Sequence, residues 1–136
     1  MKLILHLYCI IAFSVVFHEL GHLLAAVVLH VKVEKIHIGT GNAWVHWRKI
    51  EISPLIFSAY VVFEEKKLYS ISKKGILLMG LSGAAVNLLF LAMGIFLLRG
   101  MDAIFCTGTQ FALLVVNLLP FENTDMGRMI RLGSKE

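Results

Sequence analysis

The residues that could carry chemistry begin with His18-Glu19-Leu20-Gly21-His22, inside an apolar stretch near the N-terminus. On an α-helix, residues four apart lie one turn apart on the same face, so both imidazoles can reach a single metal ion. Glu19 lies beside the first histidine and can take a proton from a water at the metal without being a ligand. This arrangement is typical of zinc hydrolases. The sequence therefore predicts one zinc ion per chain, bound by His18 and His22, with Glu19 as the catalytic base.

The setting of Glu19 strengthens this prediction. Between Lys2 and Lys32, Glu19 is the only Asp, Glu, Lys or Arg. A carboxylate at membrane depth is costly unless it is paired, and such residues usually mark a function. A structural ion pair is the alternative, but the two later apolar segments contain no Lys or Arg. His6 cannot share the metal, because it precedes His18 by about 18 Å along a helix.

A third ligand is expected, because a catalytic zinc takes three protein ligands and keeps one position for water. The last apolar segment ends in Asn117-Leu118-Leu119-Pro120, and the acidic residues Glu122 and Asp125 follow it. From the residues alone, either Glu122 or Asp125 could be the ligand. Pro120 would break the helix and let irregular backbone line a polar cavity, which would allow a carboxylate to turn back toward the metal.

With these residues in view, the chain resembles the site-2 protease family, the zinc intramembrane proteases. That family combines H-E-x-x-H on one membrane helix with N-x-x-P-x-x-x-x-D-G on a later one. Asn117, Pro120 and Asp125 fall on the second pattern with matching spacing. The resemblance implies that Asp125 is the third zinc ligand. The sequence departs from the pattern at Met126, which separates Asp125 from Gly127.

Two further stretches resemble the family more weakly. The small-residue segment 80–87 ends in Asn87, which the resemblance makes an active-site candidate. The alternative is that Gly80 and Gly83 allow close helix packing while Asn87 forms an interhelical hydrogen bond. Pro54 falls in a loop segment that resembles the one thought to present substrate as a strand. The candidates for substrate or active-site support are therefore Asn87, Asn117, Pro120 and Pro54.

Three apolar segments must position these residues, at about 3–29, 75–98 and 103–119. A helix needs about 20 residues to cross a bilayer. The chain is 58% hydrophobic and 16% charged, whereas soluble domains are about 45–50% apolar and about 25% charged. The sequence therefore predicts an all-α membrane protein with three transmembrane helices, organised as a single domain over residues 1–136. The first segment is too long for a signal peptide, and no small-residue cleavage site follows it.

The loop 30–74 is expected to contain a small β-hairpin and an adjoining apolar segment. Segments 31–38 and 43–52 alternate partly, are rich in Val, Ile and Trp, and are separated by glycines that supply turn chemistry. The run 52–63 is apolar but too short to span a membrane, and it contains Pro54. We expect it to be a strand or a re-entrant segment lying against the membrane domain.

The basic residues predict an orientation. Of the 13 Lys and Arg residues, Lys2 and Arg99 flank the apolar segments on one side, and the other eleven lie on the opposite side. The positive-inside rule then places the N-terminus outside and both the loop 30–74 and the C-terminal tail in the cytoplasm, in a membrane that we expect to be a bacterial cell membrane. The net charge of +4 is assigned to these flanks, since no basic stripe interleaved with aromatics indicates nucleic-acid binding.

The residues and the resemblance together predict an intramembrane zinc metalloprotease. Its substrates would be peptide bonds within or near transmembrane segments of membrane proteins, in regulated proteolysis or in clearance of signal-peptide remnants. Because helical backbone is shielded, the substrate must unwind, and an edge strand of the loop could bind it by β-pairing. Membrane lipid is an expected partner, and self-association into a homo-oligomer is a further expectation.

The alternative is a non-catalytic zinc-binding membrane interaction protein of the same fold, against which the intact Glu19 argues. A transporter is disfavoured by the lack of a repeat.

Overall fold

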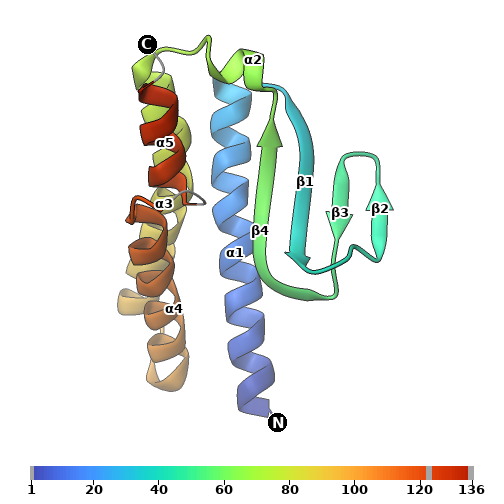
Figure 1. The fold of residues 1–136 in the computed structure, drawn as a ribbon. Helices are drawn as coiled ribbons and strands as arrows, with labels where there is room; N and C mark the ends of the chain where they lie inside the picture. Colours follow the sequence, from blue (N-terminus) through green and yellow to red (C-terminus); the bar gives the residue numbers. More distant parts are fainter. Residues whose placement is uncertain (1, 122–123, 135–136) are drawn as a thin grey trace.

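The computed structural model describes residues 2–121 and 124–134, in which three long helices lie side by side and a small sheet packs against the first (Figure 1). The long helices are α1 (Lys2–Val28), α3 (Lys73–Phe96) and α4 (Gly100–Leu118). Each is long and apolar enough to cross a membrane. The three predicted apolar helices are therefore confirmed, and every end lies within three residues of its predicted position.

Helix α1 ends in a turn that sends the chain back along the helix. His30 has a positive φ of 55°, and the Val31 N–H donates to the Ala26 carbonyl at 2.8 Å, which closes the helix as a Schellman motif. Ala26 and Val31 are then buried in a small core with Met79 of α3. The turn thus fixes where the sheet begins relative to the C-terminal half of α1.

The segment between α1 and α3 forms a four-stranded sheet in the order β2-β3-β1-β4. The strands are β1 (Val33–Thr40), β2 (Val45–Trp47), β3 (Ile50–Ile52) and β4 (Leu55–Phe63), and the short helix α2 (Glu65–Leu68) follows them. Strand β4 runs along α1 (Figure 1). There the Tyr8 ring meets the Phe57 ring at a centroid distance of 5.4 Å, and the Tyr8 hydroxyl accepts from the Ile56 N–H at 3.1 Å. The sheet is therefore anchored along α1 as well as at its end.

The predicted hairpin is wrong in its pairing. Segments 31–38 and 43–52 are not antiparallel partners, because a turn at Arg48 and Lys49 divides the second into β2 and β3. Strand β3 then lies parallel to β1, and β4 is the antiparallel partner of β1. Arg48 has a positive φ of 53°. Gly or Asn usually occupies such a position in a tight hairpin turn, so the turn could not be predicted from the residue type.

Of the two alternatives for the run 52–63, the structure has the strand, with Val33 of β1 opposite Phe63 and Thr40 opposite Leu55. The all-α class describes the three long helices but not this segment, whose backbone groups hydrogen-bond between strands. The run 52–63 is too short to cross the membrane as a helix, and its backbone N–H and C=O groups find hydrogen-bond partners in the sheet instead.

Helix α5 (Asp125–Gly133) follows α4 and runs in the same direction (Figure 1). Helix α4 ends at Leu118, before Pro120, as expected from the helix break predicted at that proline. Thr124 then caps α5, because its side-chain oxygen accepts from the Gly127 N–H at 3.3 Å. Helix α5 packs on α3 (Figure 1), so the first residue of α5 can face the bundle.

Candidate metal centre

His18 and His22 project from one face of α1 and meet Asp125, the first residue of α5. The Asp125 Oδ2 lies 3.0 Å from His18 Nε2 and 3.1 Å from His22 Nε2, and the two Nε2 atoms are 3.2 Å apart. Donor atoms about 2.0–2.1 Å from a tetrahedral zinc lie about 3.3–3.4 Å from one another. The observed triangle is close to that size. Among the described residues, this is the one group of three His, Cys, Asp or Glu side chains able to hold a metal.

The partner behind His22 determines which of its nitrogens carries the proton. His22 Nδ1 lies 2.8 Å from the Met79 carbonyl, which can only accept, so Nδ1 is the protonated nitrogen. The His22 Nε2 then presents a lone pair to the Asp125 carboxylate. Two acceptors at this distance repel each other unless a cation or an extra proton lies between them. A metal ion supplies that charge, so the donor set fits a metal.

Asn87 of α3 occupies the corresponding place behind His18. Its side chain is 0% exposed, its Nδ2 lies 2.9 Å from His18 Nδ1, and its Oδ1 has no hydrogen-bond partner among the described residues. The two ends of an amide are distinguished by their hydrogen bonds. Turning the amide by 180° lets Oδ1 accept the Nδ1 proton and frees Nε2 as a ligand, while the NH2 becomes the end without a protein partner. In that orientation Asn87 acts on His18 as the Met79 carbonyl acts on His22.

Helices α1 and α3 approach closely at this point because α3 carries no side chain there. A Cβ on Gly83 would lie 2.5 Å from His22 Nε2 and 2.6 Å from His18 Nε2. A Cβ on Gly21 would lie 2.6 Å from the Ser82 carbonyl oxygen. The close packing expected for the small-residue segment of α3 therefore has a local consequence, because a side chain at position 83 would displace both Nε2 atoms.

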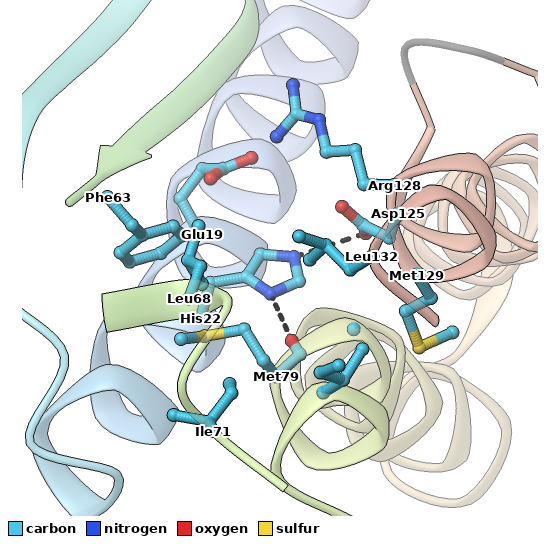
Figure 2. A pocket seen from close by; sticks show the side chains of 12 residues that line it. Glu19, His22, Phe63, Leu68, Ile71, Met79, Asp125, Arg128, Met129 and Leu132 are labelled. Atoms are coloured by element: carbon cyan, nitrogen blue, oxygen red, sulfur yellow. Dashed lines mark hydrogen bonds and ion pairs between the residues drawn. The ribbon is translucent and has the colours of Figure 1, made fainter. Parts of the chain in front are cut away.

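Glu19 lines a pocket together with His22 and Asp125 (Figure 2). Arg128 of α5 is exposed, and its guanidinium lies on the same side of the pocket as the Glu19 carboxylate (Figure 2). The rest of the wall is largely apolar and includes Phe63, Leu68, Ile71, Met79, Met129 and Leu132. The pocket thus brings a carboxylate, two potential ligands and a cation together in apolar surroundings, where a water molecule could be activated beside a bound chain.

The other predicted support residues lie apart from this centre. Asn117 is in the last turn of α4 and Pro120 follows the helix, and neither lines the pocket in Figure 2. Pro54 lies between β3 and β4, where its carbonyl accepts from the Tyr8 hydroxyl at 3.4 Å near the N-terminal end of α1. Glu122, the rival acid to Asp125, falls outside the described residues.

Three contributors to the centre escaped the sequence analysis. The Ser82 Oγ lies 3.1 Å from His22 Nδ1. Met79 acts through its main-chain carbonyl, which no side-chain pattern reveals. Thr124 begins α5 and so orients Asp125. Of the three, only Thr124 left a signal, because a threonine directly before an acidic residue is a typical start of a helix.

Comparison with known proteins identifies one family. The family model described as Peptidase family M50 matches residues 6–103, which is most of the chain and includes His18, Glu19, His22 and Asn87. No curated protein matches the chain. The matched range ends before Asp125, so the place of Asp125 beside His18 and His22 rests on the geometry above.

Proposed function

This chain belongs to peptidase family M50, the site-2 protease family, and from that premise we propose that it is an intramembrane zinc metalloprotease. It hydrolyses peptide bonds within or near the transmembrane segments of membrane-protein substrates, in regulated proteolysis or in clearance of signal-peptide remnants. The family supports a membrane metallopeptidase. The observation that carries the more specific proposal is the meeting of His18, His22 and Asp125 beside the pocket that holds Glu19.

In this proposal His18, His22 and Asp125 hold one zinc ion per chain. When bound, zinc supplies Lewis-acid chemistry, which polarises a carbonyl and makes water a nucleophile near neutral pH. Glu19 accepts a proton from the attacking water on a carboxylate oxygen and then delivers it to the leaving amine nitrogen. Asn87 keeps His18 in the tautomer whose Nε2 lone pair faces the metal. The apolar wall of the pocket limits access of bulk water.

The proposed substrate is a transmembrane segment that unwinds beside the metal. Peptide groups in an intact helix are already hydrogen-bonded and shielded, so a bond can be attacked only after local unwinding. Strand β4 is an edge strand that runs along α1, and an extended substrate could pair with its free edge. Pro54 stands just before this strand, where it would contribute to the shape of that edge rather than to the chemistry.

We also propose that α1, α3 and α4 span a bacterial cell membrane as one domain, with the N-terminus outside and the loop 30–74 and C-terminal tail in the cytoplasm. The distribution of basic residues supports this orientation. Large apolar side chains on the helix surfaces support insertion, since Ile4 and Phe96 are each 74% exposed and lipid would cover them. A second copy of the chain could cover part of this surface, which makes self-association part of the proposal.

Metal content and cleavage measured together test this function. The purified wild type should contain one zinc per chain, and Asp125→Ala should lose most of it. Glu19→Gln should keep the zinc and lose about 10²–10⁴-fold in cleavage, the usual contribution of a general base. His46→Ala, at an exposed histidine of β2, is the matched control and should change neither quantity.

Each contrary outcome has a distinct meaning. Zinc unaffected by Asp125→Ala would place the third ligand elsewhere. Cleavage retained by Glu19→Gln would contradict the role of that residue as a base. Zinc binding by a wild type that cleaves no membrane peptide would favour the non-catalytic interaction protein.

A further inference from the structure

A second hollow lies between α1 and α4, on the side of the metal centre that is nearer the N-terminus of α1. Its volume is about 290 Å³, which is roughly ten times the share of one water in the liquid and close to the lower end of ligand pockets. Its walls include Cys9, Phe13 and Ser14 of α1, Phe90 of α3, and Cys106 and Gln110 of α4. It is therefore too large to be explained by a single bridging water.

Gln110 is the unusual polar feature of this hollow. It is 2% exposed, its Nε2 donates to Ser14 Oγ at 2.6 Å, and that hydroxyl in turn donates to the Ile10 carbonyl at 2.7 Å. The Gln110 Oε1 has no partner among the described residues. An acceptor left unpaired in an apolar bundle costs stability. This oxygen is itself buried, so a donor from outside the chain meets it when the Gln110 side chain turns toward the hollow that it lines.

The hollow is in register with the metal centre. Ser14 precedes His18 by one helical turn, about 6 Å, and lies on the same face of α1. On α3, which runs in the opposite direction (Figure 1), Phe90 lies one turn from Asn87. The pocket containing Glu19 lies beside His22. A chain bound at the metal therefore meets one hollow on each side of the bond to be cleaved.

We propose that this hollow is a substrate subsite, an inference that rests on the proposed proteolytic function. A large apolar side chain of the unwound substrate lies against Phe13 and Phe90, and a backbone N–H from the same stretch donates to Gln110 Oε1. Unwinding releases N–H groups that need acceptors in apolar surroundings. A lipid acyl chain offers no such donor, so the chemistry of the hollow favours a peptide over lipid.

Photo-crosslinking tests occupancy without requiring catalysis. The full chain carrying Glu19→Gln is loaded with zinc in lipid vesicles, with p-benzoylphenylalanine in place of Phe13. The probe is a Leu/Ala transmembrane peptide with a central Gly-Pro break and a Phe beside the break, compared with an unbroken Leu/Ala helix. The control carries the same photoreactive group in place of Phe111, which is 63% exposed on α4 against 62% for Phe13 but does not line the hollow.

The expected result is cross-linking from position 13 within a few residues of the break, several-fold stronger than from position 111 and absent with the unbroken helix. Equal cross-linking from the two positions, or none from position 13, would overturn the subsite. Cross-links from position 13 mainly to lipid in the presence of the broken peptide would also overturn it and assign the hollow to lipid.

Gln110→Leu tests the hydrogen bond, because leucine removes the acceptor, together with the donor to Ser14, while keeping a side chain of similar size. Cross-linking from position 13 should fall, and KM for a cleaved peptide should rise roughly two- to tenfold, the effect of one net hydrogen bond. The kcat and the zinc content should not change. Thr109→Val, one residue away and facing a different hollow, is the matched control and should leave KM unchanged.

An unchanged KM in Gln110→Leu would overturn the role of that acceptor. If this variant fails to fold, the cross-linking comparison still tests whether substrate occupies the hollow, because the cross-linking variants retain Gln110. Failure of the subsite is also distinguishable from failure of the proposed function. Cleavage by the wild type without cross-linking at position 13 contradicts the subsite alone, whereas a wild type without zinc contradicts the function.

Discussion

Two clusters of histidine and carboxylate in this molecule use the same residue types in different arrangements. In the sheet, His37 Nδ1 lies 3.1 Å from Glu51 Oε2 and His37 Nε2 lies 3.3 Å from Ser53 Oγ, while Lys35 pairs with Glu51 at 2.7 Å. In the bundle, His18 and His22 instead turn their Nε2 atoms toward each other and toward one carboxylate oxygen. The first cluster is a chain of donor–acceptor contacts that runs from Lys35 to Ser53, whereas in the second three donor atoms face one another.

The comparison shows that arrangement distinguishes a reactive site more sharply than composition does. Serine, histidine and glutamate in a row have the order of a hydrolytic triad. Ser53, however, is 1% exposed and its hydroxyl donates to the Gly41 carbonyl at 3.0 Å, so a substrate cannot reach it. The His37 ring is also stacked on Tyr60 at 5.1 Å. In the sheet cluster each contact joins a donor to an acceptor, since Glu51 Oε2 accepts from both Lys35 and His37, whereas the bundle cluster leaves several acceptors facing one another.

Removing one histidine from each cluster should produce the largest contrast. His22→Ala deletes a converging donor and should abolish zinc binding and cleavage. His37→Ala deletes a link in a satisfied chain and should lower the melting temperature while the zinc content stays at one per chain. Metal analysis and thermal unfolding of the two variants in the same detergent provide the check. Loss of zinc in His37→Ala would show that the sheet cluster also supports the metal.

Gly83→Ala should have the next largest effect, because its new Cβ would lie within 2.6 Å of both ligand nitrogens. We expect zinc affinity to fall by at least about tenfold, the lower end of the range for losing the partner behind a ligand histidine. Gly108→Ala on α4 is the matched control, since a Cβ there meets no atom within 4 Å. Zinc titration by competition with a chelator measures the difference, and equal affinity in the two variants would contradict the close approach described for α3.

Asn87 provides a smaller and more specific test. Asn87→Leu removes the group that holds His18 Nδ1, so zinc affinity should fall roughly 10–100-fold, as for other losses of a partner behind a ligand histidine. Asn87→Asp keeps an acceptor at the same place and should restore most of the affinity. A residue that served only helix packing would show the opposite order, because a buried carboxylate would be less well tolerated than leucine.

The sequence was sufficient for the part of the site that a single helix builds. Helical spacing places His18, Glu19 and His22 together, and the apolar surroundings of Glu19 predict a function for it, which stays a prediction. Asp125 is a harder case, because it reaches the centre through the turn after α4 and the cap at Thr124. From the residues alone it could not be separated from Glu122, and the resemblance was needed to choose it.

The remaining features depend on tertiary contacts that leave little local signal. The Met79 carbonyl meets His22 only because α1 and α3 cross closely. The pairing of β1 with β3 and β4 depends on a turn at Arg48. Arg48 has a positive φ, which cannot be predicted because the residue is not a glycine. The existence of the helices was therefore predictable from the length of the hydrophobic segments, whereas the strand pairing and the main-chain hydrogen-bond partner of His22 were not.

The smallest expected effect concerns pH and the sheet cluster. The hydrogen bonds from Lys35 and His37 hold the pKa of the Glu51 carboxyl below its usual value of 4.5. A carboxyl with a lowered pKa in the folded state stabilises the fold above the unfolded pKa, and this contribution is lost as the pH falls through the folded pKa.

Glu51→Gln should therefore lower the melting temperature by only a few degrees at pH 7, as for other exposed ion pairs. The gap between wild type and variant should narrow below about pH 4, and zinc content at pH 7 should be the same in both. If the difference in melting temperature stayed constant with pH, Glu51 would stabilise the sheet through packing rather than through its charge.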